Sequence, residues 1–157
     1  MTSFSTKPPA RIPIQLAGIP VLMCIFLLAG TPFARAETVA ECVTRLKDPV
    51  QCYVTQAKFQ LKLCSMKIEL ALLKNESDFS CISEARRDVE PFYSAASKAF
   101  AQKKAAQVLL KDAQAYWLSS VSALLPSGDE TKLGYKQRLQ QREQGFDEKA
   151  NRVLLEK

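Results

Sequence analysis

Residues 48–73 read DPVQCYVTQAKFQLKLCSMKIELALL, and this stretch decides the fold. Asp48 stands where a helix cap is favoured, and Pro49 follows at the first helical position, where its missing amide has no partner to lose. The predicted helix carries two apolar rows, Val50, Val54, Ala57, Leu61, Cys64, Ile68 and Ala71 on one side and Cys52, Phe59, Leu63, Met66, Leu70 and Leu73 on another. A helix that is apolar on two sides must contact more than one neighbour.

The segments before and after this stretch also predict helices. Thr38 and Glu41 form a capping box, which opens a short helix that ends near Lys47. Downstream, apolar residues spaced seven apart predict one helix that extends from about Phe79 to Leu124. The expected order is therefore a short helix, the helix of residues 48–73, and a long third helix.

Two positions shape the C-terminal half. Pro91 removes a helical amide, so we expect the third helix to kink or restart there. Ser127 and Glu130 form another capping box, which predicts a last helix ending near Leu155. The predicted fold is all-α: an elongated antiparallel helical bundle with a short helix plus three longer helices. Residues 37–157 would form a single domain, with 37–90 as its disulfide-linked part and 91–157 as a long helical hairpin.

The four cysteines after residue 36 form an even number, which favours disulfides in an exported chain. Cys42 and Cys52 lie at equal distances from the turn at Lys47, so we expect them to pair. Cys64 and Cys81 straddle the next turn less evenly, and we expect the second disulfide between them. The alternative pairing, Cys42–Cys81 with Cys52–Cys64, is disfavoured because Cys52 and Cys64 lie too far apart along one helix. Four buried free thiols are a further alternative.

Residues 1–36 have the three parts of a secretory signal. A basic start precedes an apolar run over residues 12–29, and the tripeptide ARA at 34–36 places small residues before a cut at Glu37. We therefore expect a signal peptide over residues 1–36, with cleavage near Ala36, and a periplasmic or secreted mature protein. The alternative is an uncleaved leader that acts as a membrane anchor.

Charge and composition narrow the classes of function. The leader contains three of the 22 basic residues and none of the 16 acidic ones, which leaves residues 37–157 with a net charge of +3. Nucleic-acid-binding domains usually carry a denser basic stripe, so we expect no nucleic-acid partner. The chain contains no histidine, the commonest general base. The sequence predicts no catalytic residue, no cofactor and no metal site.

The second apolar row of residues 48–73 is longer than the short first helix can cover. We therefore expect a non-enzymatic protein-binding module, an adaptor or chaperone-like protein, that binds its partner through apolar grooves between helices. The alternative is a structural subunit of an envelope or secretion complex that associates with itself. Basic side chains on two helices could add an anion-binding flank. The candidate partner-binding residues are Phe59, Leu63, Met66, Leu70, Lys58, Lys62, Lys103 and Lys104.

Overall fold

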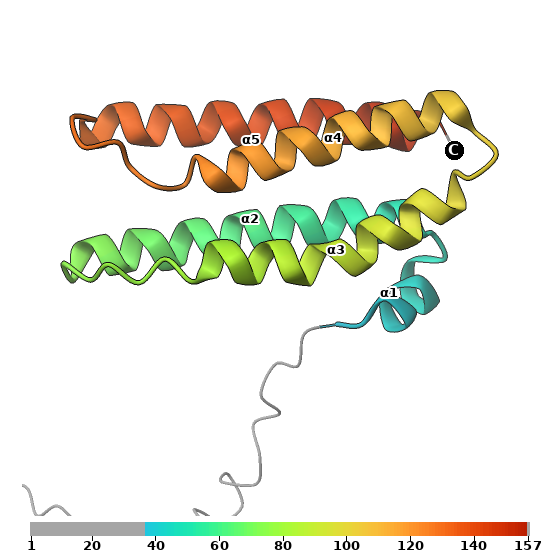
Figure 1. Cartoon of the computed structure of the whole chain (residues 1–157), viewed down its shortest axis with the longest axis horizontal. Helices are drawn as coiled ribbons and strands as arrows, with labels where there is room; N and C mark the ends of the chain where they lie inside the picture. Colours follow the sequence, from blue (N-terminus) through green and yellow to red (C-terminus); the bar gives the residue numbers. More distant parts are fainter. Residues whose placement is uncertain (1–36, 157) are drawn as a thin grey trace, which may run out of the picture. The chain divides into compact units, whose positions relative to one another are not determined.

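The computed structural model describes residues 37–156, and the predicted leader, residues 1–36, lies outside the described residues. The described chain is all-helical (Figure 1). Its helices are α1 (Val39–Leu46), α2 (Pro49–Leu73), α3 (Cys81–Ala99), α4 (Lys104–Ser122) and α5 (Lys132–Leu155). Within residues 37–156, no helix is both long and apolar enough to cross a bilayer.

Helices α2 to α5 form a bundle in which consecutive helices run in opposite directions (Figure 1). The helices α2 and α3 lie side by side in one layer, and α4 and α5 form the second layer. The short helix α1 packs against the beginning of α2. The all-α bundle expected from the sequence is therefore confirmed.

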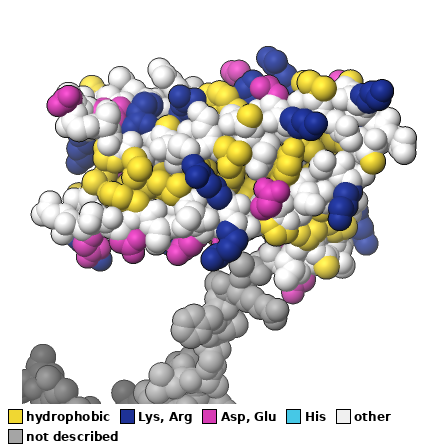
Figure 2. Space-filling model, viewed as in Figure 1, with side chains coloured by type: hydrophobic (Ala, Val, Ile, Leu, Met, Phe, Trp, Pro, Cys, Tyr) yellow, Lys and Arg dark blue, Asp and Glu magenta, His cyan; other side chains and the backbone are white. Residues whose placement is uncertain are grey.

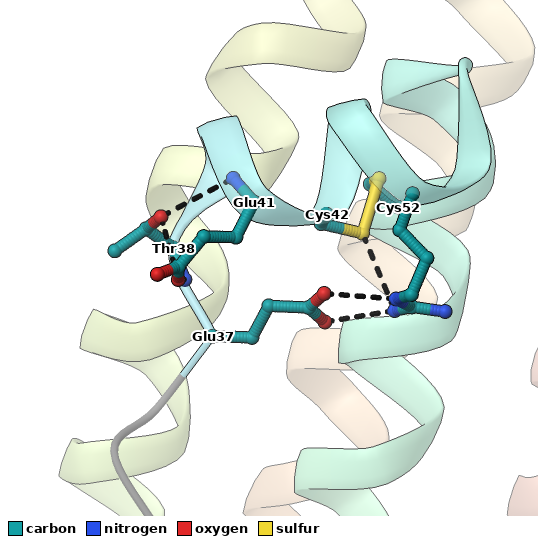
Figure 3. Close-up of polar contacts among 6 residues, drawn as sticks. Glu37, Thr38, Glu41, Cys42 and Cys52 are labelled. Carbon is teal, nitrogen blue, oxygen red and sulfur yellow. Dashed lines mark hydrogen bonds and ion pairs between the residues drawn. A yellow bond between two sulfur atoms is a disulfide. The ribbon is translucent and has the colours of Figure 1, made fainter.

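The turn between α1 and α2 is fixed by local signals that the sequence displays. The Thr38 hydroxyl accepts a hydrogen bond from the Glu41 amide at 3.3 Å, and the Glu41 carboxylate accepts one from the Thr38 amide at 2.7 Å (Figure 3). Lys47 then reverses the chain with a left-handed φ of 60°. Asp48 caps α2 by accepting a hydrogen bond from the Val50 amide at 2.8 Å. The first capping box and the cap at Asp48 are thus confirmed.

Both predicted disulfides are present in the described chain. The Cα atoms of Cys42 and Cys52 are 5.8 Å apart, and those of Cys64 and Cys81 are 5.3 Å apart. The first cross-link joins α1 to α2, and the second joins α2 to the start of α3. All four cysteines are buried. Disulfides form and persist where thiols oxidise, so the cross-links indicate an oxidising, exported environment.

The single helix predicted from Phe79 to Leu124 is wrong, because the chain breaks it at residues 100–103 into α3 and α4. Pro91 neither ends nor restarts a helix and lies inside α3. Its side chain is exposed, as is that of Arg87 one turn earlier, so the carbonyl that Pro91 leaves unpaired can bind water. The break follows Phe100, whose side chain is buried in the core. Packing of this ring outweighs the helical preference of its alanine-rich surroundings.

The last helix also begins later than expected. Thr131, rather than Ser127, is the cap of α5, and its hydroxyl accepts a hydrogen bond from the Gly134 amide at 3.1 Å. The Glu130 carboxylate accepts a hydrogen bond from the Ser127 amide at 3.5 Å, which is half of the predicted capping box, and it also binds the Arg138 guanidinium with contacts of 2.6 and 2.8 Å. The Ser127–Glu130 contact therefore lies in the connection before α5, and the helix itself starts at the Thr131 cap.

Two buried hydrogen bonds join the layers. The Trp117 indole donates to the carbonyl of Ala57 at 2.8 Å, and the Tyr53 hydroxyl donates to the Gln114 amide oxygen at 2.9 Å. Trp117 and Tyr53 have no exposed surface, and burial raises the pKa of the Tyr53 phenol. These contacts fix α4 against α2 across the core and so determine which side of α2 faces outward.

Candidate functional site

The most conspicuous surface feature is a row of apolar side chains on α2, here called the outer row. It contains Phe59, Leu63, Met66, Leu70 and Leu73. The exposed fractions are 55% for Phe59, 52% for Met66, 55% for Leu70 and 73% for Leu73, and Leu63 is half-buried. Alternating steps of four and three residues keep all five on one side of the helix. The outer row therefore leaves a regular apolar strip in water.

The outer row begins where the cover provided by α1 stops. Cys52 lies on the same side of α2, seven residues before Phe59, and is fully buried. Its disulfide to Cys42 holds α1 against this first part of α2. Because α1 has only eight residues and ends at Leu46, the remainder of that side stays uncovered. Three of the four predicted apolar contact residues are thus exposed, and Leu63 is partly so.

The lysines beside the outer row are neutralised by acids from the neighbouring helices. On one side, Lys58 contacts Asp147 of α5 at 2.8 Å, and Lys62 contacts Glu143 of α5 at 3.8 Å. On the other side, Lys67 contacts Glu84 of α3 at 3.1 Å. The α2 part of the expected basic flank is therefore an ion-paired border of both charge signs.

The structure does not bring the remaining predicted lysines to this border. Lys103 lies in the connection between α3 and α4, and Lys104 begins α4. The ammonium group of Lys103 donates to the carbonyl of Glu156 at 3.4 Å. This contact lies at the C-terminal end of α5, more than two turns beyond Asp147, which binds Lys58. The lysines of α2 and those at the start of α4 are thus at different levels of the bundle.

A pocket of about 440 Å³ adjoins the C-terminal end of the outer row. This end pocket is lined by Glu69, Leu72, Leu73, Pro126, Glu130, Lys132, Tyr135 and Lys136. Leu73 belongs to both the outer row and the end pocket. Sequence reasoning missed the pocket because only the fold brings the connection between α4 and α5 to the last turn of α2.

The wall of the end pocket is fixed by hydrogen bonds to the connection between α4 and α5. The Tyr135 hydroxyl donates to the carbonyl of Leu124 at 2.8 Å. The Arg138 guanidinium donates to the carbonyls of Ala123 and Leu125, the latter at 3.1 Å, and also binds Glu130. These contacts hold Tyr135 and Arg138 of α5 against the connection between α4 and α5.

Apolar surface also appears elsewhere. Figure 2 shows one face of the molecule, on which hydrophobic side chains gather along the seam between the two layers. Leu118 of α4 is exposed, and a hydrogen bond of 2.7 Å from Arg86 of α3 to Ser122 of α4 bridges the two helices. The apolar side chains along this seam thus come from helices of both layers, whereas those of the outer row all come from α2 and have a regular spacing.

Within residues 37–156, no group of three or more acidic or cysteine side chains could hold a metal ion. The Arg45 guanidinium lowers the pKa of the Glu37 carboxyl, and the Arg138 guanidinium lowers that of Glu130. A carboxyl that serves as a general acid near neutral pH needs a raised pKa, and the pKa values of these two groups are shifted in the opposite direction.

The candidate site consists of the outer row, its ion-paired border and the end pocket. The outer row has the regular spacing of a coiled-coil seam, and the lining of the end pocket combines apolar side chains with charged ones. Comparison of the chain with protein-family models, with curated protein sequences and with solved structures finds no match in any of the three.

Proposed function

We propose that this chain is an exported, non-enzymatic protein-binding module, an adaptor or chaperone-like protein, that binds another polypeptide through the outer row of α2. The observation that carries this proposal is the exposure of Phe59, Met66 and Leu70, each more than half in water. Burial of apolar surface contributes about 25 cal/mol per Å², so a contiguous exposed strip favours association with a partner.

The spacing of the outer row favours a helical partner. Steps of four and three residues are the pattern of a coiled-coil seam, in which each side chain fits between side chains of the facing helix. The border offers carboxylates and ammonium groups on both sides, which can orient a partner helix but would not select strongly for one charge sign. The partner class is therefore an amphipathic helix with apolar residues at the same spacing.

Export is part of the proposal. Residues 1–36 would be the signal peptide, cut before Glu37, and the mature protein would act in the periplasm or outside the cell. The buried disulfides support this, because such bonds are rare in reducing compartments. Intact-mass measurement of the exported protein tests the cut directly.

Site-specific photocrosslinking in the exporting host tests the binding site. A photoreactive phenylalanine analogue replaces Phe59 or Met66 of the full chain, and the products are separated by mass. We expect an adduct with a polypeptide from both positions. Val108 is the matched control, because it is similarly exposed but lies on α4. Adduct formation from position 108 alone, or from none of the three positions, would refute the proposal.

A further inference from the structure

The outer row has a length and an arrangement that allow two copies of α2 to pack against each other. It spans residues 59–73, about 21 Å at a rise of 1.5 Å per residue. No other described helix covers its middle, since Phe59, Met66 and Leu70 are all more than half exposed. Two helices related by a two-fold axis present the same surface to each other, so each outer row could provide the apolar strip that the other requires.

We propose that the outer row binds a second copy of this chain, with the two α2 helices antiparallel about a two-fold axis. In this arrangement Phe59 lies opposite Leu70 of the second copy, and Leu63 lies opposite Met66. The proposal rests on the proposed function, because both require the outer row to be a protein contact, and it names the partner.

The charges on the α5 side of the row support this register. Lys62 and Glu69 border the outer row there, and antiparallel packing places Lys62 of each copy opposite Glu69 of the other. Glu69 forms no ion pair within the described residues, and the one ion pair of Lys62 there is its 3.8 Å contact with Glu143. The Lys62 side chain is 66% exposed, so it can reach a second carboxylate. Two intermolecular ion pairs would form per dimer.

The same charges disfavour the neighbouring register. Sliding one copy until Leu63 lies opposite Leu73 of the other would bring Glu69 opposite Glu69, and Lys67 opposite Lys67. Like charges that face each other are destabilising. The charge pattern beside the outer row therefore distinguishes between the two apolar pairings and selects the one in which Phe59 meets Leu70.

The selected register leaves part of the candidate site open. Its apolar layers use residues 59–70, which lie beyond the part of α2 that α1 covers at Cys52. Leu73 and the lining of the end pocket, with the exception of Glu69, lie outside the paired layers. Each copy of the dimer would thus keep most of its end pocket open, at opposite ends of the paired helices, with Glu69 at the edge of the pocket bound by Lys62 of the other copy.

Sedimentation velocity of the purified, fully oxidised protein tests the proposal over a range from micromolar to submillimolar concentration. We expect a reversible monomer–dimer equilibrium. Lys62→Glu alone and Glu69→Lys alone should each weaken the dimer about tenfold, because each replaces two attractive contacts with two repulsive ones. The double variant should restore the original affinity. Met66→Glu should abolish dimerisation, and Val108→Glu, the exposed control on α4, should leave it unchanged.

Circular dichroism confirms that each variant is folded, and the charge exchange decides the question if Met66→Glu is not. A monomer at every concentration, a dimer insensitive to both charge reversals, or a double variant without rescue would each overturn the second copy as the occupant. A monomer that still forms adducts with a different polypeptide from position 59 would overturn this inference and leave the proposed function standing. A monomer without such adducts would overturn both.

Discussion

The helices within one layer of the bundle are held to each other by different kinds of contact from the helices within the other layer. The layer of α2 and α3, together with α1, is cross-linked by Cys42–Cys52 and Cys64–Cys81. The hairpin of α4 and α5 is joined by polar contacts, such as the 2.6 Å ion pair between Lys149 and Asp112. The connection at its closed end is held by hydrogen bonds from the guanidinium group of Arg138. The first layer thus has covalent links in addition to side-chain contacts, whereas the contacts within the second layer are between side chains and the backbone carbonyls near them.

This difference bears on where a binding surface can lie. A disulfide stabilises mainly by restricting the unfolded chain, by about 3 kcal/mol for loops of this length. It therefore stabilises a helix pair without requiring that every apolar side chain of the pair be buried. The outer row lies on α2, the helix to which both disulfides attach. In the other layer, the stability of the hairpin depends on how closely its own side chains fit.

Removing a buried contact between the two layers should lower the free energy of unfolding more than any other change considered. Trp117→Ala removes a fully buried ring and its hydrogen bond to the carbonyl of Ala57. We expect a loss of about 3–5 kcal/mol in the free energy of unfolding, as for other large buried aromatic side chains. Urea denaturation with both disulfides intact measures it, and Leu118→Ala, at an exposed neighbour, is the control. A loss below about 1 kcal/mol would mean that the two layers are stable independently.

Removing one cross-link should have the next largest effect. Replacing Cys64 and Cys81 together by alanine should lower the free energy of unfolding by about 3 kcal/mol. The double replacement of Cys42 and Cys52 should cost a similar amount and, in addition, free α1 from α2. Hydrogen exchange distinguishes the two variants: amides of α1 should lose protection selectively in the second. Equal loss of protection throughout α2 to α5 in that variant would contradict the limited role of α1.

Much of the cross-linked layer could be predicted from the sequence, because its determinants are close together in the chain. The capping box at Thr38, the cap at Asp48 and both cysteine pairs involve residues at most 17 positions apart. The break after Phe100 was not predictable in the same way. No glycine or proline marks it, and Lys103, the cap residue of α4, forms no capping hydrogen bond through its side chain. The break accompanies the burial of the Phe100 ring, and that burial depends on contacts with residues distant in the sequence.

The candidate site likewise has one feature that the sequence reveals and others that only the fold creates. The regular spacing of the outer row is visible in the sequence, but its exposure depends on the length of α1 and on which sides of α2 the helices α3 and α5 cover. The acids that neutralise Lys58 and Lys62 are in α5, far away in the chain. The end pocket combines the last turn of α2 with the connection between α4 and α5. Periodicity within one segment contains no information about such contacts.

The close fit inside the hairpin of α4 and α5 predicts that the effect of Gly145→Ala on the free energy of unfolding changes sign when Tyr116 is removed. A methyl group added there would overlap the phenol of Tyr116, so Gly145→Ala should destabilise the protein by about 1 kcal/mol despite the higher helix propensity of alanine. In a Tyr116→Ala background the overlap is absent, and the same substitution should stabilise by up to about 1 kcal/mol. Urea denaturation of the four proteins measures this. If Gly145→Ala changed the free energy of unfolding in the same direction in both backgrounds, the phenol of Tyr116 would not be what limits the space at position 145.

The smallest expected effect concerns the ion pair beside the connection between α4 and α5. The hydrogen bond from Arg138 lowers the pKa of the Glu130 carboxyl below its usual value. A carboxyl with a lowered pKa in the folded state contributes stability above its unfolded pKa and loses that contribution as the pH falls through its folded pKa. Glu130→Gln should therefore destabilise the protein at neutral pH, and its difference from the natural protein should vanish at acidic pH.

Urea denaturation at several pH values measures that difference, and added salt should reduce it, because both side chains lie near the surface. Asp129→Asn is the matched control, since Asp129 is the preceding residue and forms no ion pair within the described part of the chain. Arg138 keeps its hydrogen bonds to the carbonyls of Ala123 and Leu125 when Glu130 is neutral, so the connection should hold its shape. A difference that stays constant with pH would show that those carbonyl contacts, rather than the ion pair, close the hairpin.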